Sequence, residues 1–470
     1  MVYYKIWGRR KFDKFRYLSY KKLMKKIIIV GGVAAGMSAA SKAKRLNREL
    51  NITVYEKTDM ISWGSCGLPY YVGDFYQDSE RMIAKPLAQF NKEGITVKMK
   101  HEVIGIDPNK REVTVKDLNS GEIFNDSYDE IIIATGASAI KPPIKNIDLK
   151  NIFTLKEFSD GIELKKAILK AENREIVIIG AGYIGLEAVE AAIHLGKKVR
   201  VIQLSERVLP ESFDKEITDI MEEELSSHKD VTLNLNETVT EFEGKDGKVA
   251  FVITNKGKYS ADIVILATGV RPNTKFLENT GIETLRNGAI IIDSRGRSNI
   301  NGIYAAGDCA SVYHKVKKEN VYIPLATNSN KIGRVVGEHL AGIDKEFKGT
   351  LGSAAIKVLN LEAGRTGISE EEAKKMGINY KTVFIEDKNQ TSYYPGQEDI
   401  FIKIIYDVDS RVLLGGQIIG KKGAVLRVDV LAAAIDKEMT VDELAYLDLC
   451  YAPPFSLTWD PLNVVGNLAK

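Results

Sequence analysis

Cys66 is the residue whose setting in this sequence is best suited to chemistry. It lies in the stretch Ser62-Trp63-Gly64-Ser65-Cys66-Gly67-Leu68-Pro69-Tyr70-Tyr71, and the other two cysteines, Cys309 and Cys450, are far away along the chain. A single redox-active sulfur has to alternate between a thiolate and a mixed disulfide, a persulfide or a sulfenic acid. Pro69 predicts the first turn of a helix that begins just after Cys66, and the amino-terminal end of a helix favours a thiolate. We therefore expect Cys66 to be reactive and the other two cysteines to be structural.

A nucleotide-binding unit at residues 25–56 precedes this cysteine. An apolar run at residues 25–30 predicts a buried parallel strand, and Gly31-Gly32-Val33-Ala34-Ala35-Gly36 follows it. A helix is expected from Met37 to Leu46 and a second strand from Ile52 to Tyr55. The first glycine permits a tight turn, and the small residues let the backbone approach a pyrophosphate at the helix amino terminus. Glu56, directly after the second strand, is placed to accept hydrogen bonds from a ribose.

A second copy of this unit begins with the strand at residues 175–179. It continues with an intact GxGxxG turn, Gly180-Ala181-Gly182-Tyr183-Ile184-Gly185, a helix to Leu195 and a strand at residues 198–203. Two such units in one chain predict two dinucleotides, as in a flavoprotein that takes hydride from a nicotinamide. The second strand ends in Gln203 instead of an acid, and Arg207 lies close enough in sequence to meet a 2′-phosphate. Arg207 could equally be a solvated loop charge, so the choice between NADH and NADPH stays open.

The rest of the chain completes a two-domain nucleotide-binding body and adds a third domain. Buried strands end in Ala134-Thr135-Gly136 and again in Ala267-Thr268-Gly269, and Asp308 follows a strand at a position suited to a ribityl hydroxyl. After about residue 347 the pattern becomes that of an α+β domain. The predicted fold class is α/β, with two Rossmann-like dinucleotide-binding domains and a C-terminal α+β domain. The expected boundaries are 24–149 with 268–347 for the first domain, 150–267 for the second and 348–470 for the third; the family resemblance described below implies that these domains bind FAD, bind NAD(P)H and form a dimer, respectively.

Composition limits the function classes. The chain has 470 residues, 44% of them apolar and 27% charged, which is too long for one core and typical of a globular protein. Residues 1–23 hold eight of the Lys and Arg residues and one acid, so the body is acidic, which argues against a general nucleic-acid role. We expect these 23 residues to be a flexible arm or an extension from an upstream start. No apolar run suggests a membrane helix, the three cysteines fit a reducing cytoplasm, and the scattered histidines suggest no metal site.

Together these residues resemble the pyridine nucleotide–disulfide oxidoreductase superfamily. The sequence is most similar to its single-cysteine branch, which comprises coenzyme A-disulfide reductases, NAD(P)H-dependent persulfide or polysulfide reductases and related NADH oxidases. The resemblance covers the chain from about Lys25 onward. Its marks are Gly31–Gly36, Cys66-Gly67-Leu68-Pro69-Tyr70, the second fingerprint, Ala305-Ala306-Gly307-Asp308 and Tyr451-Ala452-Pro453-Pro454-Phe455. Ser65 departs from the branch, where Asn commonly precedes the cysteine.

The resemblance implies cofactor contacts in both units and a homodimer formed by the last domain, which lends residues to the partner's site. The implied FAD contacts are Gly31, Ala34, Ala35, Gly36, Glu56, Thr135, Gly136, Asp308, Pro324, Leu325 and Ala326. The implied NAD(P)H contacts are Gly180, Gly182, Tyr183, Ile184, Gly185 and Glu187, with Tyr183 as an aromatic gate over the flavin.

The resemblance also implies a substrate and a set of residues around the sulfur. Tyr393 and Tyr451 match two tyrosines that reach the partner's active sulfur in coenzyme A-disulfide reductases, and Ser62, four residues before the cysteine, also matches. Arg45 matches a residue that helps hold coenzyme A, and Lys92 is a secondary candidate for the same task. NAD(P)H would reduce FAD, which would split a mixed disulfide between Cys66 and coenzyme A. The Cys66 thiolate would then attack the next disulfide or persulfide, with Tyr393 or Tyr451 protonating the leaving sulfur.

Two other enzyme types remain as alternatives. In an NADH oxidase or peroxidase, Cys66 would cycle through a sulfenic acid, but Ala34 occupies the position where related peroxidases and water-forming oxidases have a histidine. A flavin reductase serving a small electron-transfer protein is the second alternative, although such chains usually lack the Cys66 and Tyr451 constellation. Coenzyme A disulfide, coenzyme A persulfide, polysulfide and elemental sulfur are not distinguished by the sequence.

Overall fold

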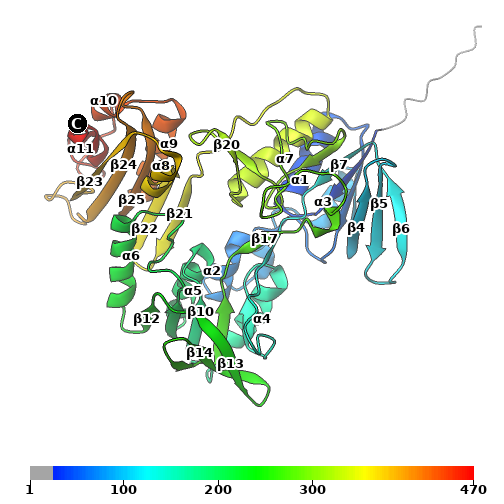
Figure 1. Cartoon of the computed structure of the whole chain (residues 1–470), viewed down its shortest axis with the longest axis horizontal. Coiled ribbons are helices and arrows are strands. Elements are labelled where there is room, and N and C mark those ends of the chain that lie inside the picture. Colours follow the sequence, from blue (N-terminus) through cyan, green and yellow to red (C-terminus); the bar gives the residue numbers. More distant parts are fainter. Residues whose placement is uncertain (1–24) are drawn as a thin grey trace, which may run out of the picture.

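Three five-stranded sheets organise the chain in a computed structural model that describes residues 25–470 (Figure 1). The predictions for the first 23 residues and for Met24 lie outside these described residues. Two of the sheets are fully parallel, and the third is antiparallel. The predicted α/β class with an additional α+β domain is confirmed.

The first parallel sheet has the order β18-β7-β1-β2-β3 and draws its strands from two separate parts of the chain. A three-stranded antiparallel sheet, β4-β5-β6, is appended to it. The elements of this body are β1 (Lys26–Val30), α1 (Ala34–Leu46), β2 (Asn51–Glu56), α2 (Leu68–Val72), α3 (Leu87–Lys92), β3 (Ile95–Met99), β4 (His101–Asp107), β5 (Glu112–Asp117), β6 (Ile123–Ser127), β7 (Glu130–Ile133), β18 (Ile303–Ala305), β19 (Val312–His314), β20 (Glu319–Val321) and α7 (Ala326–Leu340).

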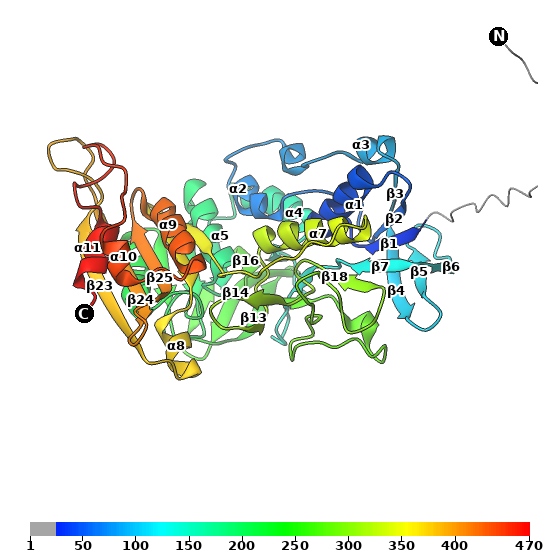
Figure 2. The same ribbon diagram turned by 90° about the horizontal axis from the view of Figure 1, so that it is seen from above.

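Helices α1 and α7 lie side by side over this sheet (Figure 2). They approach closely because α7 presents glycines to α1: a Cβ on Gly333 would lie 2.5 Å from the carbonyl oxygen of Ala35, and one on Gly337 would lie 2.5 Å from that of Ala39. Helix α1 begins at Ala34, three residues earlier than predicted, so the turn residues Ala34 to Gly36 are its first turn. The close packing brings the start of α7, including Ala326, toward the Gly-rich turn.

The second parallel sheet has the order β12-β11-β10-β16-β9 and lies entirely within residues 150–267. Strands β8 (Ala137–Ala139) and β17 (Val270–Pro272) pair with each other where the chain enters and leaves this body. Its elements are β9 (Ile152–Thr154), α4 (Phe158–Ile168), β10 (Glu175–Ile179), α5 (Tyr183–His194), β11 (Lys198–Ile202), α6 (Lys215–Ser227), β12 (Val231–Asn234), β13 (Val239–Lys245), β14 (Lys248–Thr254), β15 (Lys258–Ser260) and β16 (Ile263–Leu266).

The C-terminal body is an antiparallel sheet, β21-β22-β25-β24-β23, with helices packed against it. Strand β22 has a weak strand signal in the sequence, because its Ala and Gly residues are poor strand formers. The elements are β21 (Ala354–Val358), β22 (Leu361–Gly367), α8 (Glu370–Met376), β23 (Tyr380–Lys388), β24 (Asp399–Asp407), β25 (Leu413–Gly420), α9 (Ala424–Asp436), α10 (Val441–Ala445) and α11 (Pro461–Leu468).

A buried lysine joins the second body to the C-terminal one. Lys403 in β24 is almost completely buried, and its Nζ lies 2.8 Å from Glu216 Oε2 at the start of α6 and 3.5 Å from Asp214 Oδ2. The same Nζ lies 2.5 Å from Glu370 Oε2 of α8. A buried cation with three carboxylates is stable only when this geometry is kept, so the contact fixes how the two bodies meet.

Candidate active site

The loop that carries Cys66 is tied to the Gly-rich turn and to a neighbouring segment by backbone hydrogen bonds. The Ser62 amide donates to the Gly32 carbonyl (2.8 Å), and the Gly64 amide donates to the Met82 carbonyl (2.8 Å). Ser62 has φ of 49°, a left-handed conformation that is uncommon for a residue other than glycine and that turns the chain sharply before the cysteine. Cys66 lies in a single 3-10 turn, Ser65–Gly67, with its side chain exposed. The loop therefore holds the sulfur beside the first nucleotide-binding turn.

The predicted helix after Cys66 is present as α2, with a proline at its start. This short helix packs between two helices of the second body. A Cβ on Gly161 of α4 would lie 2.2 Å from Leu68 Cδ2, and one on Gly73, at the end of α2, would lie 2.9 Å from Ala191 Cα of α5. The loop of the first body that carries Cys66 thus leads into a helix that is positioned by helices of the second body.

The protein groups around Cys66 act against the thiolate, in contrast to our expectation. Partial burial raises the pKa of the Cys66 thiol, and the carboxylate of Glu187 raises it further. Lys156 opposes them, because its positive charge lowers that pKa. The five-residue α2 supplies little helix dipole, so thiolate formation depends on Lys156 and on charges that a bound cofactor brings.

The first Gly-rich turn has the features of a dinucleotide cradle. Gly31 has φ of 108°, and a Cβ there would lie 2.2 Å from the carbonyl oxygen of Ala134, so only glycine fits. The buried Glu56 accepts a hydrogen bond from the Gly32 amide (2.7 Å) and others from the amide and hydroxyl of Thr58 (both 2.8 Å). These bonds fix the carboxylate at the end of β2, where a ribose would be met.

Asp308 and Lys156 form an ion pair near the sulfur. Asp308 Oδ2 lies 2.9 Å from Lys156 Nζ, and Oδ1 accepts a 3.3 Å hydrogen bond from the Ser329 hydroxyl of α7. Lys156 was not predicted from the sequence, because it belongs to the segment between β9 and α4 and no motif marks it. It links the predicted flavin ligand Asp308 to the electrostatics of Cys66.

The Ala134-Thr135-Gly136 segment after β7 is fixed by hydrogen bonds to Asn273. The Thr135 hydroxyl donates to the Asn273 carbonyl (2.8 Å), and the Asn273 side-chain amide donates back to the Thr135 carbonyl (3.0 Å). A Cβ on Gly136 would meet no atom within 4 Å, so this strand end faces open space. The predicted contacts Pro324 and Leu325 precede α7, and Leu325 is its N-cap residue. These small or open positions fit a bound FAD.

Two glycines of the second GxGxxG turn are required by close backbone contacts, and the third faces open space. A Cβ on Gly180 or Gly185 would overlap backbone, at 2.4 Å from the Ala267 oxygen and 2.0 Å from the Gly180 oxygen respectively. At Gly182 the same atom would meet nothing within 4 Å. Gln203 takes the place that Glu56 has in the first unit, since its Oε1 accepts from the Ala181 amide (2.9 Å). The turn therefore leaves room for a dinucleotide at Gly182.

Arg207, our candidate for a 2′-phosphate, is used inside the protein. It is 7% exposed, and its guanidinium donates to the carbonyls of Phe213 (2.8 Å) and Pro210 (3.0 Å) and pairs with Glu371 of the C-terminal body. Neither alternative from the sequence describes it, because the side chain is not a solvated loop charge and is not turned toward a ribose. The 2′-phosphate role is withdrawn.

Tyr183, Ile184 and Glu187 lie on the first turns of α5, beside α2. Burial raises the pKa of the Tyr183 hydroxyl, which keeps it neutral. Burial and then the neighbouring Glu190 raise the pKa of Glu187 to about 7. A strongly shifted carboxyl pKa of this kind is often found at functional sites, and the charge of Glu187 acts on Cys66.

Tyr393 and Tyr451 lie in the C-terminal body, on two loops at the end of the molecule away from the first body (Figure 2). Their hydroxyl oxygens are 3.0 Å apart, and the side chains are 73% and 46% exposed. The structure thus brings the two tyrosines to each other. Arg45, in the last turn of α1, and Lys92, the last residue of α3, are both exposed at the surface of the first body.

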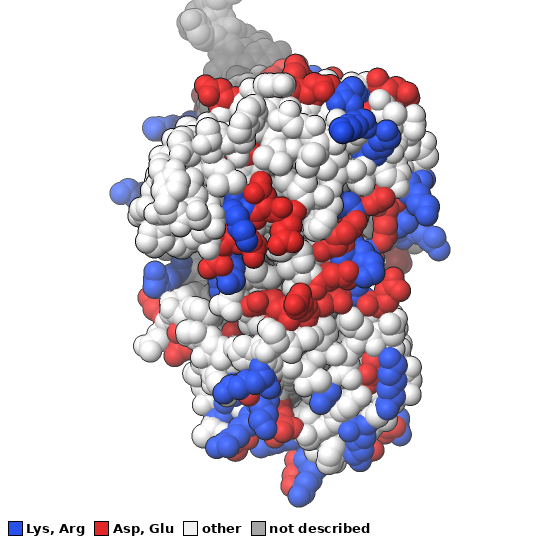
Figure 3. Space-filling model, turned by 90° about the vertical axis from the view of Figure 1, so that its left-hand side faces the viewer, with Lys and Arg blue, Asp and Glu red and all other residues white. Residues whose placement is uncertain are grey.

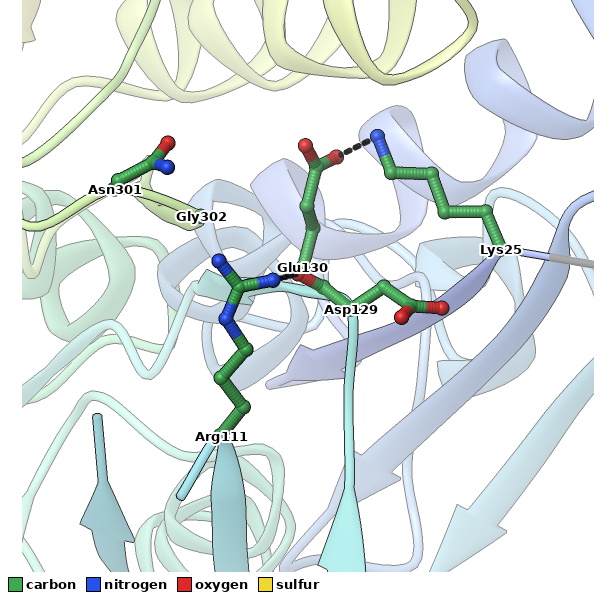
Figure 4. A pocket seen from close by; sticks show the side chains of 6 residues that line it. All are labelled: Lys25, Arg111, Asp129, Glu130, Asn301 and Gly302. Atoms are coloured by element: carbon green, nitrogen blue, oxygen red, sulfur yellow. Dashed lines mark hydrogen bonds and ion pairs between the residues drawn. The ribbon is translucent and has the colours of Figure 1, made fainter. Parts of the chain in front are cut away.

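A polar pocket of about 410 Å³ lies at the amino-terminal ends of β1, β7 and β18, at the opposite end of these strands from the Gly-rich turn (Figure 4). Lys25 and Glu130 form an ion pair of 2.7 Å there, and Arg111 donates to the Asp129 carbonyl (3.3 Å). Because this pocket lies away from the Gly-rich turn, it is not part of the candidate active site around Cys66. Among residues 25–470, no cluster of three or more His, Cys, Asp or Glu is placed to hold a metal ion, and no helix could span a membrane.

Comparisons with known proteins agree with this geometry. The family model described as pyridine nucleotide-disulphide oxidoreductase matches residues 25–333, and the one for its dimerisation domain matches residues 353–461. A relative from Pyrococcus abyssi, named NAD(P)H sulfur oxidoreductase (CoA-dependent), is 40% identical over 449 residues, 96% of this chain and 99% of the relative. An NADH oxidase from Enterococcus faecalis is 34% identical over 446 residues, 94% of this chain and 99% of the relative.

A solved structure shows the same architecture. The NAD-dependent persulfide reductase from A. fulgidus superimposes with a TM-score of 0.90 at 34% identity, covering 94% of this chain and 83% of that one. Membership of this family explains the two nucleotide-binding turns, the exposed cysteine that lies between them in the sequence and the additional antiparallel domain. The chain belongs to the pyridine nucleotide-disulphide oxidoreductase family and is an oxidoreductase that uses FAD and NAD(P)H.

Proposed function

We propose that this enzyme reduces a disulfide or persulfide of coenzyme A, or a polysulfide, with electrons from NAD(P)H and with Cys66 as its single redox cysteine. The observation that carries the proposal is the placement of an exposed thiol between the FAD turn and the helices of the second body. The coenzyme A-dependent activity named for the Pyrococcus abyssi relative, which aligns over nearly the whole chain, supports this substrate class. We assign FAD to residues 24–149 and 268–347, NAD(P)H to 150–267 and dimerisation to 348–470.

The chain's own groups have distinct tasks in this reaction. When bound, FAD takes hydride from NAD(P)H and passes the electron pair to sulfur. The Cys66 thiolate attacks one sulfur of the substrate, so that a Cys66 disulfide forms and the other sulfur leaves and takes a proton. Two electrons and a further proton then split this bond, which restores the thiolate and releases the second thiol. Asp308, paired with Lys156, would hold the bound flavin. Lys156 opposes the pKa increase at Cys66, whereas the charge of Asp308 adds to it.

We further propose that Tyr393 and Tyr451 serve the Cys66 of a second copy. Both belong to the domain that matches the dimerisation model, and the end of the molecule that carries β23, α11 and α6 shows a broad uncharged surface above an acidic band (Figure 3). Large exposed apolar side chains concentrate in this domain. They include Tyr393, Tyr394, Leu426, Tyr446, Phe455 and Trp459.

Arg45 and Lys92 are proposed to bind the phosphates of coenzyme A. Both are exposed cations at the carboxyl-terminal ends of helices of the first body, where a long substrate whose thiol reaches Cys66 could extend along the surface. Because all three cysteines are free, we also propose that the enzyme works in a reducing compartment such as the cytoplasm.

An NADH oxidase activity is the second candidate, favoured by the Enterococcus faecalis relative of that name. Ala34 at the start of α1 leaves no imidazole in the first turn to protonate a peroxide. The rate of NAD(P)H consumption with and without a sulfur substrate distinguishes sulfur reduction from oxygen reduction. We expect coenzyme A disulfide or persulfide to accelerate NAD(P)H consumption under nitrogen, and Cys66→Ser to abolish this acceleration. Full substrate-dependent turnover by Cys66→Ser, or consumption that requires oxygen alone, would overturn the proposal.

A further inference from the structure

Helix α5 carries two carboxyl groups one turn apart, Glu187 and Glu190, on the side that faces the Cys66 region. Residues three apart on a helix lie on one face. Glu190 is 8% exposed, and its Oε2 is buried without a hydrogen-bond partner among the described residues. Its other oxygen pairs with Lys357 of β21, from the C-terminal body. The pair therefore has one carboxyl group held by a cation and one without such a partner.

Helix α2, which follows Cys66 in the chain, packs on α5, the helix that carries these carboxyl groups. Tyr70 of α2 meets Phe75 edge-on with ring centroids 5.9 Å apart, and Phe75 stacks on His194, the last residue of α5, at 4.1 Å. The charge of Glu187 acts on Cys66, whose pKa it raises after the larger effect of burial. Burial, followed by the charges of Glu187, Glu190 and Cys66, also raises the pKa of Tyr70, to about 12.

Two neighbouring carboxyl groups that are largely removed from water do not both ionise readily, so they titrate as a pair. Lys357 forms an ion pair with Glu190, and the charge of Glu190 acts on Glu187. Burial first and then the charge of Glu190 bring the pKa of Glu187 to about 7. The other groups that act on this cluster are Tyr183 with its neighbour Arg365, and, on the far side of Cys66, Lys156 and Asp308.

We propose that Glu187 is a positioning residue that couples its own proton to the charge of Cys66. A neutral Glu187 favours the Cys66 thiolate, and an ionised Glu187 favours the thiol. When the thiolate becomes a neutral disulfide by attack on substrate, Glu187 can release its proton to solvent, so the site keeps one negative charge before and after the step. The inference rests on the proposed role of Cys66 and adds a group that controls when this sulfur is reactive.

The test measures the pH dependence of Cys66 alkylation in the reduced holoenzyme. Short pulses of iodoacetamide between about pH 5.5 and pH 9.5, followed by peptide mass spectrometry, report the thiolate fraction of Cys66 separately from that of Cys450. Cys450 is also exposed and serves as an internal control. Glu187→Gln keeps the size of the side chain and removes its charge. Glu223→Gln, on the exposed face of α6, is the matched control.

We expect the wild-type Cys66 profile to contain a second inflection near the pKa of Glu187, about 7. Glu187→Gln should remove this inflection and raise the Cys66 alkylation rate at pH 8 by about threefold to tenfold, because a lost neighbouring negative charge lowers a thiol pKa by up to about one unit. Cys450 should react alike in all variants, and Glu223→Gln should match the wild type.

Lys357→Met provides a second variant, because loss of this positive charge from the cluster disfavours an ionised Glu187 and should shift the inflection to higher pH. A Cys66 profile that Glu187→Gln leaves unchanged, in a protein with a wild-type melting temperature, would overturn the coupling. Failure of the proposed function would give a different result. In that case Cys66→Ser would still reduce the sulfur substrate, and the effect of Glu187 on Cys66 alkylation could still be measured.

Discussion

The hydroxyl oxygens of Tyr393 and Tyr451 lie 3.0 Å apart, although the two residues are 58 positions apart in the sequence. Tyr393 belongs to the connection between β23 and β24, and Tyr451 follows α10. One hydroxyl donates its proton to the other, so the second proton of the pair remains free to point outward. The hydrogen bond to Tyr451 raises the pKa of Tyr393. We propose that the pair delivers one proton to a sulfur of a second copy and then regains a proton through the hydrogen bond between the two hydroxyls.

Replacement of both tyrosines should slow disulfide reduction more than replacement of either one. We expect Tyr393→Phe/Tyr451→Phe to lower kcat by about 100-fold, the lower range for a positioned proton donor, and each single variant to lower it less because one hydroxyl remains. Tyr394→Phe is the matched control, since this exposed neighbour of Tyr393 lies outside the pair. Stopped-flow measurement of thiol release gives the rates, and rates in the two single variants and the double variant equal to that of the wild type would contradict the role.

Substitutions of two glycines in the second GxGxxG turn should distinguish an effect on folding from an effect on NAD(P)H binding. Gly185→Ala places a Cβ 2.0 Å from the Gly180 oxygen and should lower the melting temperature or prevent folding. Gly182→Ala meets no protein atom within 4 Å and has an ordinary φ of −81°, so the melting temperature should be unchanged. Its methyl group would occupy the space for the pyrophosphate, and KM for NAD(P)H should rise about tenfold. An unchanged KM would place the dinucleotide elsewhere.

Arg207→Ala should destabilise the protein without altering cofactor preference. The loss of two hydrogen bonds to buried carbonyls and of the Glu371 pair should cost about 2–4 kcal/mol. The ratio of kcat/KM for NADPH to that for NADH should stay at the wild-type value. By contrast, Gln203→Glu should favour NADH, because a carboxylate there would repel a 2′-phosphate. A selective loss of NADPH activity in Arg207→Ala would restore the 2′-phosphate role that we have withdrawn.

Stability should fall with acid through Glu372. Burial acts to raise the pKa of this carboxyl group, but Arg365 and Lys317 outweigh it and hold the pKa at about 2. A folded-state pKa below the unfolded value near 4.5 means that the stabilisation is complete above about pH 5 and disappears as the pH falls toward 2.

Glu372→Gln should therefore lower the free energy of unfolding by about 2 kcal/mol at pH 7 and flatten its decline between pH 5 and pH 2. Urea unfolding at several pH values measures both effects. Glu319→Gln, at an exposed position, should behave like the wild type. The same acid slope in Glu372→Gln and the wild type would show that other carboxyl groups determine it.

Local sequence signals predicted the two nucleotide-binding units well. Glycine patterns, apolar runs and the acid Glu56 depend on neighbours within a few dozen residues, and the structure places Glu56 against the Gly32 amide. The prediction of α2 after Cys66 also held, because Pro69 is a local signal.

Contacts between distant segments could not be predicted in this way. Lys156 pairs with Asp308 across 152 positions, and Lys357 meets Glu190 from another domain. A lysine in a loop and one in a strand carry no sign of their partners. Arg207 shows the opposite error, since its place after a Rossmann strand suggested a ligand contact and tertiary packing directs it inward.

The identity of the species bound to Cys66 tests the central claim most directly. The holoenzyme is incubated with coenzyme A disulfide without NAD(P)H, and digested under non-reducing conditions for peptide mass spectrometry. The account predicts one coenzyme A in disulfide linkage on the Cys66 peptide, none on the Cys450 or Cys309 peptides, and its release on addition of NAD(P)H. A Cys66 that stays unmodified, or an adduct that NAD(P)H does not remove, would contradict it.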